Sequence, residues 1–198
     1  MKALYLICFV GGLAISATAA PADLPGVANF HQVDQNLYRG AQPSDAGLKN
    51  LAALGVKTII DLRHGTDRAD TEQREAERLG LRYINVPMEG LTPPTDKQIA
   101  DLMAIFKTAD NGAVFVHCRE GKDRTGAVIA CYRIAHDHWT NDRALEEAKS
   151  YGLHATQHPR QNYIMHFSSG DTGLSQTGLS RNGVESSTGA SAQPLPVA

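Results

Sequence analysis

The sequence lacks three features: a strong net charge, histidines with zinc-site spacing, and an apolar run long enough to span a membrane. Its formal net charge is only -2, so neither nucleic acid nor a charged membrane surface is expected as a partner. The histidines lack the spacing of a zinc site: His136 and His138 are two apart near a helix end, and His154 and His158 fall in a loop. The apolar run 3–15 is shorter than the roughly 20 residues that span a bilayer.

The N-terminal segment is similar to a secretory signal peptide. One lysine precedes the apolar run, and small residues follow at Ala17-Thr18-Ala19. We therefore predict a signal peptide over residues 1–20, cleaved after Ala19 or Ala20, and a linker over 21–28. A membrane-anchored helix is the alternative, but the apolar run is short for it. The prediction is an exported protein, periplasmic or secreted, without stable membrane insertion after cleavage.

Cysteine is scarce, with three residues in the whole chain. Cys8 would be removed with the signal peptide, which leaves Cys118 and Cys131 in the mature protein. If Cys131 lies about two turns into a helix that begins near Arg124, the two cysteines are roughly 10 Å or more apart. A disulfide is therefore not expected, and Cys131 is interpreted as a small apolar core residue.

Short apolar segments alternate with helical segments along most of the chain. Ser44, Thr95 and Thr140 have the residue types and positions of helix N-caps, and Thr95 begins a capping box with Gln98. Further helices are predicted from about Asp67 or Asp70 to Leu79, over 127–135 and over 160–167. The predicted strands are 30–33, 37–39, 57–62, 81–87 and 113–116.

This alternation predicts an α/β fold. At 198 residues the chain is long enough for one domain with a real core. We place a single domain at residues 29–168, with a largely parallel central sheet flanked by helices on both faces. Residues 169–198 are rich in serine, threonine and glycine and poor in large apolar residues, so they are predicted to be a disordered tail.

One loop carries the chemistry that the sequence predicts. The segment His117–Gly126, the nucleophile loop, follows the buried-type strand 113–116 and leads into the apolar helical segment 127–135. It contains Cys118 and, six residues later, Arg124. A thiolate, a series of backbone N–H groups and a planar cationic side chain are the groups needed to accept a phosphoryl group.

The position of this loop favours an anionic ligand and an anionic sulfur. At the carboxyl end of a parallel strand, residues 119–124 can direct their N–H groups inward, and the following helix adds its partial positive charge. The same field favours the thiolate of Cys118, because a nearby helix N-terminus and nearby cations lower a cysteine pKa.

The flanking residues have predicted roles of their own. Arg124 can bind two phosphate oxygens at once, which lysine cannot do with the same geometry. Thr125 can donate its hydroxyl to the thiolate, and His117 is expected to bind backbone rather than act as a base. Gly121 and Gly126 allow close backbone approach. The predicted phosphate-binding residues are Arg119, Glu120, Gly121, Lys122, Asp123, Arg124 and Thr125.

The sequence HCREGKDRTG, with its spacing from Cys118 to Arg124, resembles the signature of the cysteine-dependent protein tyrosine phosphatase superfamily. The resemblance is to the small, atypical dual-specificity branch. LYRGAQPS at 37–44 and KTIIDLR at 57–63 are also similar to segments of that branch. The resemblance implies a phosphomonoester hydrolase that works through a cysteinyl-phosphate and needs no metal or other cofactor. It makes Cys118 the nucleophile and Arg124 the phosphate ligand, with a phosphoprotein or a phosphorylated small molecule as substrate.

The sequence departs from this family at the proton donor. The family uses an aspartate about thirty residues before the cysteine, whereas the corresponding segment 88–94 reads MEGLTPP. Glu89 and Asp96 are the two candidates. Asp96 has the usual residue type and is slightly preferred, although its place after the capping Thr95 also suits a helix-dipole role. Glu89 has the better spacing, although a carboxylate in a loop can also be a solvated surface residue without a catalytic role.

Other functions remain open at this stage. Arg119, Lys122 and Arg124, with Arg63 or His64 at the rim, would suit inositol phosphates or phosphoinositides. A rhodanese-like sulfurtransferase also presents a cysteine after a strand, but the Arg-Thr pair and the preceding histidine argue against it. A non-catalytic phosphate-binding module is supported only by the missing aspartate.

Overall fold

The computed structural model describes residues 23–65, 67–108 and 112–172. The predicted signal peptide lies outside the described residues, and so does the predicted tail beyond residue 172. Within the described part of the chain, strands alternate with helices from the first strand to the last. The predicted α/β class is therefore confirmed.

The described residues form a sheet of five strands in the order β1-β2-β5-β3-β4. β2 pairs in parallel with β5, β5 with β3, and β3 with β4, whereas β1 is antiparallel to β2 at one edge. The predicted, largely parallel sheet is thus confirmed, with β5 at its centre. The strands are β1 (His31–Gln32), β2 (Leu37–Gly40), β3 (Val56–Arg63), β4 (Arg82–Met88) and β5 (Ala113–His117).

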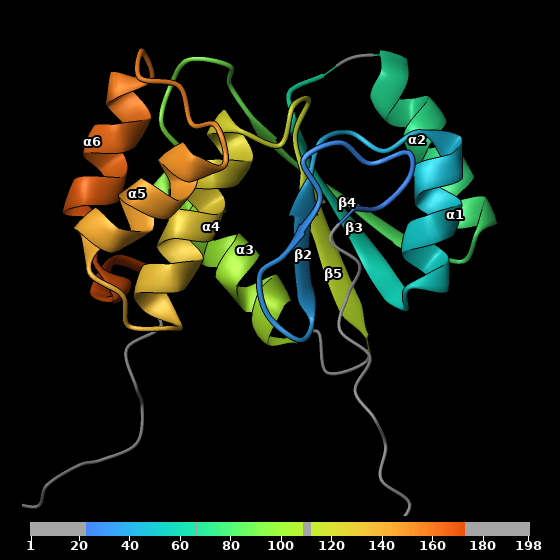
Figure 1. The fold of residues 1–198 in the computed structure, drawn as a ribbon, viewed down its shortest axis with the longest axis horizontal. Helices are drawn as coiled ribbons and strands as arrows, with labels where there is room; N and C mark the ends of the chain where they lie inside the picture. Colours follow the sequence, from blue (N-terminus) through green and yellow to red (C-terminus); the bar gives the residue numbers. More distant parts are fainter. Residues whose placement is uncertain (1–22, 66, 109–111, 173–198) are drawn as a thin grey trace, which may run out of the picture.

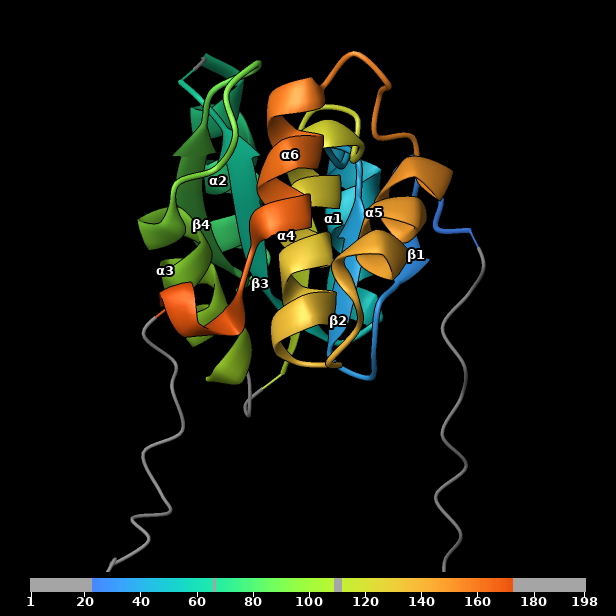
Figure 2. The ribbon, with the colours of Figure 1, turned by 90° about the vertical axis from the view of Figure 1, so that its left-hand side faces the viewer.

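Helices cover both faces of this sheet. Helices α1 and α2 lie on one face, and α3, α4, α5 and α6 lie on the other, as Figures 1 and 2 show from two directions. None of the helices in the described ranges is both long enough and apolar enough to span a membrane. The helices are α1 (Asp45–Ala53), α2 (Asp67–Arg78), α3 (Asp96–Lys107), α4 (Asp123–Ala135), α5 (Asn141–Ser150), α6 (His158–His166) and the 3-10 helix η2 (Ser169–Thr172).

Three helices begin where the sequence predicts an N-cap. The side chain of Ser44 accepts a hydrogen bond from an N–H in the first turn of α1, and that of Thr140 does the same for α5. Thr95 and Gln98 form both bonds of a capping box at the start of α3. These contacts satisfy backbone donors that have no partner inside the helix, so the helices begin at defined residues.

The core is divided by the sheet into two apolar layers. Phe115 of β5 packs with Ile59 of β3 on the side of α1 and α2. Its neighbour Val116 belongs to the other layer, together with Val128 and Cys131 of α4. Cys131 is fully buried, and neither it nor Cys118 forms a disulfide, as predicted. Because β5 and α4 are both buried, the loop between them is fixed at each end.

The ends of the domain differ from the sequence prediction. Leu24 and Val27, predicted to lie in a linker, are buried in the layer under α1. The carbonyl of Gly26 accepts a hydrogen bond of 2.9 Å from the backbone N–H of Ser44, at the cap of α1. Burial of two apolar side chains and hydrogen bonds to its backbone thus hold this short segment on the domain. At the other end, η2 packs against α3 and α4 instead of belonging to the tail.

Candidate active site

The nucleophile loop lies at the carboxyl edge of the sheet, where the parallel strands end together. His117, the last residue of β5, is paired with Gly40 at the end of β2 and with Asp61 near the end of β3. The loops that follow β2, β3, β4 and β5 consequently meet at one edge of the domain. In open α/β sheets this edge is where ligands bind.

Cys118 is buried, with only 3% of its surface exposed. Burial on its own would raise the pKa of the thiol, but the pKa lies below its ordinary value because polar groups outweigh burial. The hydroxyl and N–H of Thr125 contribute most, followed by the charge of Arg124 and the N–H of Glu120. Thr125 Oγ1 is buried and has no hydrogen bond of ordinary geometry within the described ranges, so the nearby sulfur is the group that it can stabilise. The site favours a thiolate.

The backbone of the nucleophile loop is arranged as an anion-binding turn. The N–H groups of Glu120 and Thr125 reach the sulfur, so they face the interior of the loop. Lys122, at the N-cap of α4, makes no side-chain capping bond, so its side chain does not occupy the helix N-terminus. Both features leave backbone donors for an anion, as the sequence predicts.

The carbonyl groups of the loop point the other way and are bound from outside. The N–H of Gln42 donates to the carbonyl of Arg119 at 3.2 Å. The carbonyl of Gly121 accepts from Asn29 Nδ2 at 3.0 Å and from Arg39 Nη2 at 2.7 Å. With its outward carbonyls bound, the loop keeps its N–H groups directed inward.

Gly121 allows this close packing. Its φ angle is +68°, in the left-handed region that favours glycine. A Cβ at this position would lie 2.4 Å from the carbonyl carbon of Gly40 and 2.6 Å from the N of Ala41. The nucleophile loop therefore rests directly on the backbone at the end of β2.

Arg39 lies behind the loop and was not identified as a functional residue from the sequence. It is almost completely buried, and its guanidinium stacks on the Tyr151 ring at 4.6 Å from the centroid. Burial lowers the pKa of Arg39 to about 10, so the side chain stays charged at neutral pH. The only signal for it was its place in the LYRGAQPS segment, which the sequence linked to the site by resemblance alone.

The remaining predicted phosphate-binding residues lie along the same loop. Arg124 is half-buried, and its Nη1 is 3.4 Å from the carbonyl oxygen of Met88 at the end of β4. Arg119 is exposed, and Lys122 forms a 3.1 Å ion pair with exposed Glu120. A longer-range contact is made by Asp123, whose carboxylate receives the backbone N–H of His154 at 2.9 Å.

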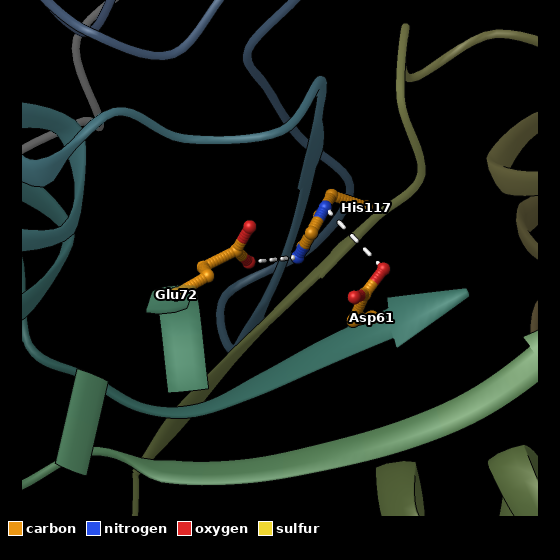
Figure 3. A group of neighbouring side chains, drawn as sticks. All are labelled: Asp61, Glu72 and His117. Carbon is orange, nitrogen blue, oxygen red and sulfur yellow. Dashed lines mark ion pairs between the residues drawn. The ribbon is translucent and has the colours of Figure 1, made fainter. Parts of the chain in front are cut away.

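Under the loop lies a buried cluster of charges, formed by Asp61, Arg63, Glu72 and His117. Figure 3 shows His117 between the two carboxylates, with Nε2 at 2.8 Å from Glu72 and Nδ1 at 4.0 Å from Asp61. Nδ1 also lies 3.2 Å from the carbonyl oxygen of Cys118, the kind of backbone contact that the sequence predicts for His117. Burial acts to lower the pKa of His117, but Glu72 and Asp61 raise it above its ordinary value. Both ring nitrogens face acceptors, an arrangement that favours the protonated imidazole.

The donor atoms of Asp61, Glu72 and His117 lie within 4.8 Å of one another, close enough to suggest a metal site. Arg63, however, already binds both acids. Its Nε and Nη2 donate to Asp61 at 2.8 and 2.7 Å, and Nη2 also lies 2.8 Å from Glu72. The two carboxylates thus already face a guanidinium and an imidazole whose protonated form they favour, so their charge is offset by side chains of the protein.

The same contacts exclude Arg63 from the two residues, Arg63 and His64, that were the predicted alternatives for the rim of the site. Arg63 is buried because the cluster provides two carboxylates for it, one on its own strand and one on α2. His64, the next residue, is exposed and lies 3.2 Å from the Glu89 carboxylate. Of these two rim candidates, only His64 is at the surface.

The structure separates the two proton-donor candidates. Glu89 directly follows β4, next to Met88, whose carbonyl contacts Arg124. Asp96 lies in the first turn of α3 and accepts a 2.8 Å hydrogen bond from the Tyr163 hydroxyl. Its charge helps to raise the pKa of Cys131, after the larger effect of burial. Asp96 is therefore bonded to Tyr163 of α6, whereas Glu89 is one residue from the carbonyl that contacts Arg124 of the nucleophile loop.

Residues 24–165 match the family model described as a DSP-PTPase phosphatase fused to NAD+ kinase. The dual specificity protein phosphatase TpbA of Pseudomonas aeruginosa is 30% identical over 142 residues, which cover 70% of this chain and 62% of TpbA. The inositol diphosphatase DSP3 of Arabidopsis thaliana is 29% identical over 131 residues, or 63% of each chain. The chain thus spans slightly less than two thirds of the length of these curated relatives.

Solved structures show the same fold. A crystal structure of a cysteine-to-serine variant of P. aeruginosa TpbA in complex with pTyr has a TM-score of 0.65 and 23% identity, and covers 80% of this chain and 95% of that chain. The core catalytic domain of the PP-IP phosphatase Siw14 from S. cerevisiae, in complex with citrate, has a TM-score of 0.65 and 21% identity, and covers 76% of this chain and 92% of that chain. Because the family model spans well over half of the sequence, the chain belongs to the DSP-PTPase family of cysteine-dependent phosphatases, as its nucleophile loop predicts.

Proposed function

We propose that this protein hydrolyses phosphomonoesters through a cysteinyl-phosphate, with Cys118 as the nucleophile. The observation that carries the proposal is the buried thiol of lowered pKa, enclosed by inward N–H groups at the start of α4 and next to Arg124. This arrangement pairs a thiolate with an anion-binding turn, which is the combination that phosphoryl transfer requires. Membership of a phosphatase family supports this reaction over sulfur transfer.

In the first step, the Cys118 thiolate attacks phosphorus, a P–S bond forms, and the P–O bond to the leaving group breaks. The backbone N–H groups and Arg124 bind the remaining oxygens, whose charge is greatest in the transition state. We assign the proton for the departing oxygen to Glu89, because it directly follows Met88, whose carbonyl lies 3.4 Å from Arg124, whereas Asp96 is held at the start of α3. A general acid typically contributes about 10²- to 10⁴-fold.

In the second step, water attacks phosphorus and the P–S bond breaks. Glu89, now ionised, takes the proton from the water, and inorganic phosphate is released. The Thr125 hydroxyl and the surrounding N–H groups stabilise the thiolate as it leaves, because they are the groups that lower the pKa of Cys118. The enzyme returns to its starting state without a redox partner.

Hydrolysis of 4-nitrophenyl phosphate tests the proposal. The expected result is turnover that vanadate inhibits and that is absent in Cys118→Ser. Arg82→Met is a suitable control, because it removes an exposed cation from β4, outside the predicted phosphate-binding residues. Tight phosphate binding without turnover of any phosphomonoester would instead identify a non-catalytic binding module.

A second candidate substrate class is the inositol phosphates. Its support is the presence of exposed Arg119 and half-exposed Lys122 in the loop, and the likeness to an inositol diphosphatase. A panel of phosphotyrosine, phosphoserine and polyphosphorylated inositols would decide between the classes. Preference for the polyphosphorylated inositols, lost in Arg119→Met and Lys122→Met together, would favour this candidate.

We also propose that the protein is exported to the periplasm or secreted. The support is the sequence of residues 1–20, with its lysine, apolar run and small residues. Mass spectrometry of the mature chain from a bacterial expression host should find Ala20 or Pro21 at the N-terminus. An intact Met1 in the cytoplasmic fraction would contradict the proposal.

A further inference from the structure

Arg160 of α6 binds the backbone of the loop that carries Glu89. Its side chain is almost entirely buried, with the residue 1% exposed. Nη2 donates to the carbonyl of Glu89 at 2.5 Å, and Nη1 donates to the carbonyl of Gly90 at 2.8 Å. Nη1 also donates to the side-chain oxygen of Gln157, one turn back at the start of the helix. A single guanidinium therefore holds two consecutive carbonyl groups of the β4–α3 loop.

This guanidinium is buried without a carboxylate partner. Arg160 forms no salt bridge within the ranges that the structure describes, so loop carbonyls and one amide oxygen are its acceptors. Burying a cation without a counter-ion is unfavourable unless its donors find such partners. These hydrogen bonds therefore hold the β4–α3 loop in place, because breaking them would leave the buried charge of Arg160 without acceptors.

The guanidinium also lies in the electrostatic field of the nucleophile loop. The pKa of Arg160 lies below its ordinary value, mainly because the side chain is buried. The charges of Asp123 and Cys118 raise this pKa, whereas the charge of Arg124 lowers it. Three residues of the nucleophile loop thus lie close enough to Arg160 for their charges to change its pKa. The β4–α3 loop and the nucleophile loop share this neighbour, although about thirty residues separate them in sequence.

The other link between the two loops is weaker. Arg124 Nη1 is 3.4 Å from the Met88 carbonyl, close to the limit for a hydrogen bond. In the proposed reaction Arg124 must bind phosphate, and its donors are then directed to the substrate. Arg160 bonds to the next two carbonyls, so it can hold the loop while Arg124 is engaged.

We propose that Arg160 is a positioning residue that fixes the main chain of Glu89 and Gly90 beside the nucleophile loop, so that the Glu89 side chain can deliver its proton. This inference rests on the proposed function and assigns a role at the same site. The Glu89 carboxylate remains 60% exposed and contacts His64, so the side chain is free to turn while its backbone is held. Gln157, which bonds to the same guanidinium, orients it.

The test compares Arg160→Lys and Arg160→Met with Arg82→Met, which removes an exposed arginine from β4, the strand that leads into this loop. Lysine keeps the charge but lacks the planar pair of donors, so it should not replace arginine. Hydrogen exchange of the backbone amides of 89–92 should be faster in both Arg160 variants and unchanged in Arg82→Met. Equal exchange in all the proteins would overturn the proposal, whether or not the protein turns over a phosphomonoester.

Kinetics with two esters then link the loop to proton donation. The Arg160 variants should lose about 100-fold in kcat on phenyl phosphate but less than about threefold on 4-nitrophenyl phosphate, whose leaving group needs no proton. Vanadate inhibition should be unchanged, and Arg160→Met should add nothing to the loss in Glu89→Gln. Equal losses on both esters would refute the positioning role. Absence of wild-type turnover would refute the proposed function itself.

Discussion

Replacing Gly121 by alanine should inactivate the enzyme more than it destabilises the fold. The new Cβ would lie 2.4 Å from the Gly40 carbonyl carbon, whereas ordinary contacts begin near 3.4 Å, so the loop must move by about 1 Å. A displacement of this size can reduce turnover by about 100-fold. Left-handed backbone at an alanine costs only about 1–2 kcal/mol. Gly121→Ala should therefore reduce kcat/KM by a larger factor than it reduces the stability of the fold.

Gly55 is the matched control for this substitution. Its φ of +97° is also left-handed, but a Cβ there would meet nothing within 4 Å. Gly55→Ala should lower the free energy of unfolding by about 1–2 kcal/mol and leave hydrolysis of 4-nitrophenyl phosphate unchanged. Thermal unfolding and initial rates, measured on both variants, distinguish the effect of left-handed backbone strain, present in both, from that of the steric clash, present only in Gly121→Ala. A folded Gly121→Ala protein with wild-type kcat/KM would show that the loop does not depend on this contact.

Other predictions follow from the thiol groups and the buried charges. Thr125→Val should raise the pKa of Cys118, so the pH profile of iodoacetamide inactivation should move to higher pH; an unmoved profile would show that the hydroxyl does not stabilise the thiolate. In the native protein, Cys118 should be alkylated and Cys131 spared, because burial raises the pKa of Cys131 and removes it from solvent; peptide mapping that finds both labelled would contradict this. Glu72→Ala leaves buried charges unpaired and should cost about 3–5 kcal/mol in urea unfolding, whereas Glu75→Ala, on the same helix but paired with an exposed arginine, should cost much less.

The sequence predicted those features of the structure that depend on residues close together in the chain. The caps at Ser44 and Thr95 depend on side chains within three positions of each other, so their signals can be read from the sequence directly. Cys118 and Arg124 are likewise on one continuous loop, bounded by a strand and a helix that are both apolar. The α/β class followed from the alternation of such segments.

Residues that act across the sheet were not predictable in the same way. Arg39 and Arg160 meet their carbonyl partners 82 and 70 residues away, and these contacts depend on strand order and helix placement. Either Arg63 or His64 was predicted at the rim, because both follow a strand that ends next to the site. Only the tertiary fold brings Glu72 of α2 over β3 and turns Arg63 inward. The choice between Glu89 and Asp96 likewise depended on where the loop after β4 runs.

The bonds of Asn29 have a consequence for synthesis of the chain. Its side-chain amide donates to the carbonyls of Gly121 and Tyr151, which are 92 and 122 residues away. The bond to Gly121 can therefore form only once the nucleophile loop has been made, and the bond to Tyr151 only after α5 has been made. Contacts of such high sequence separation form late and slowly. A growing chain can thus contain Cys118 before the turn around it is complete, so the reactive thiolate is a property of the finished domain rather than of the nascent chain.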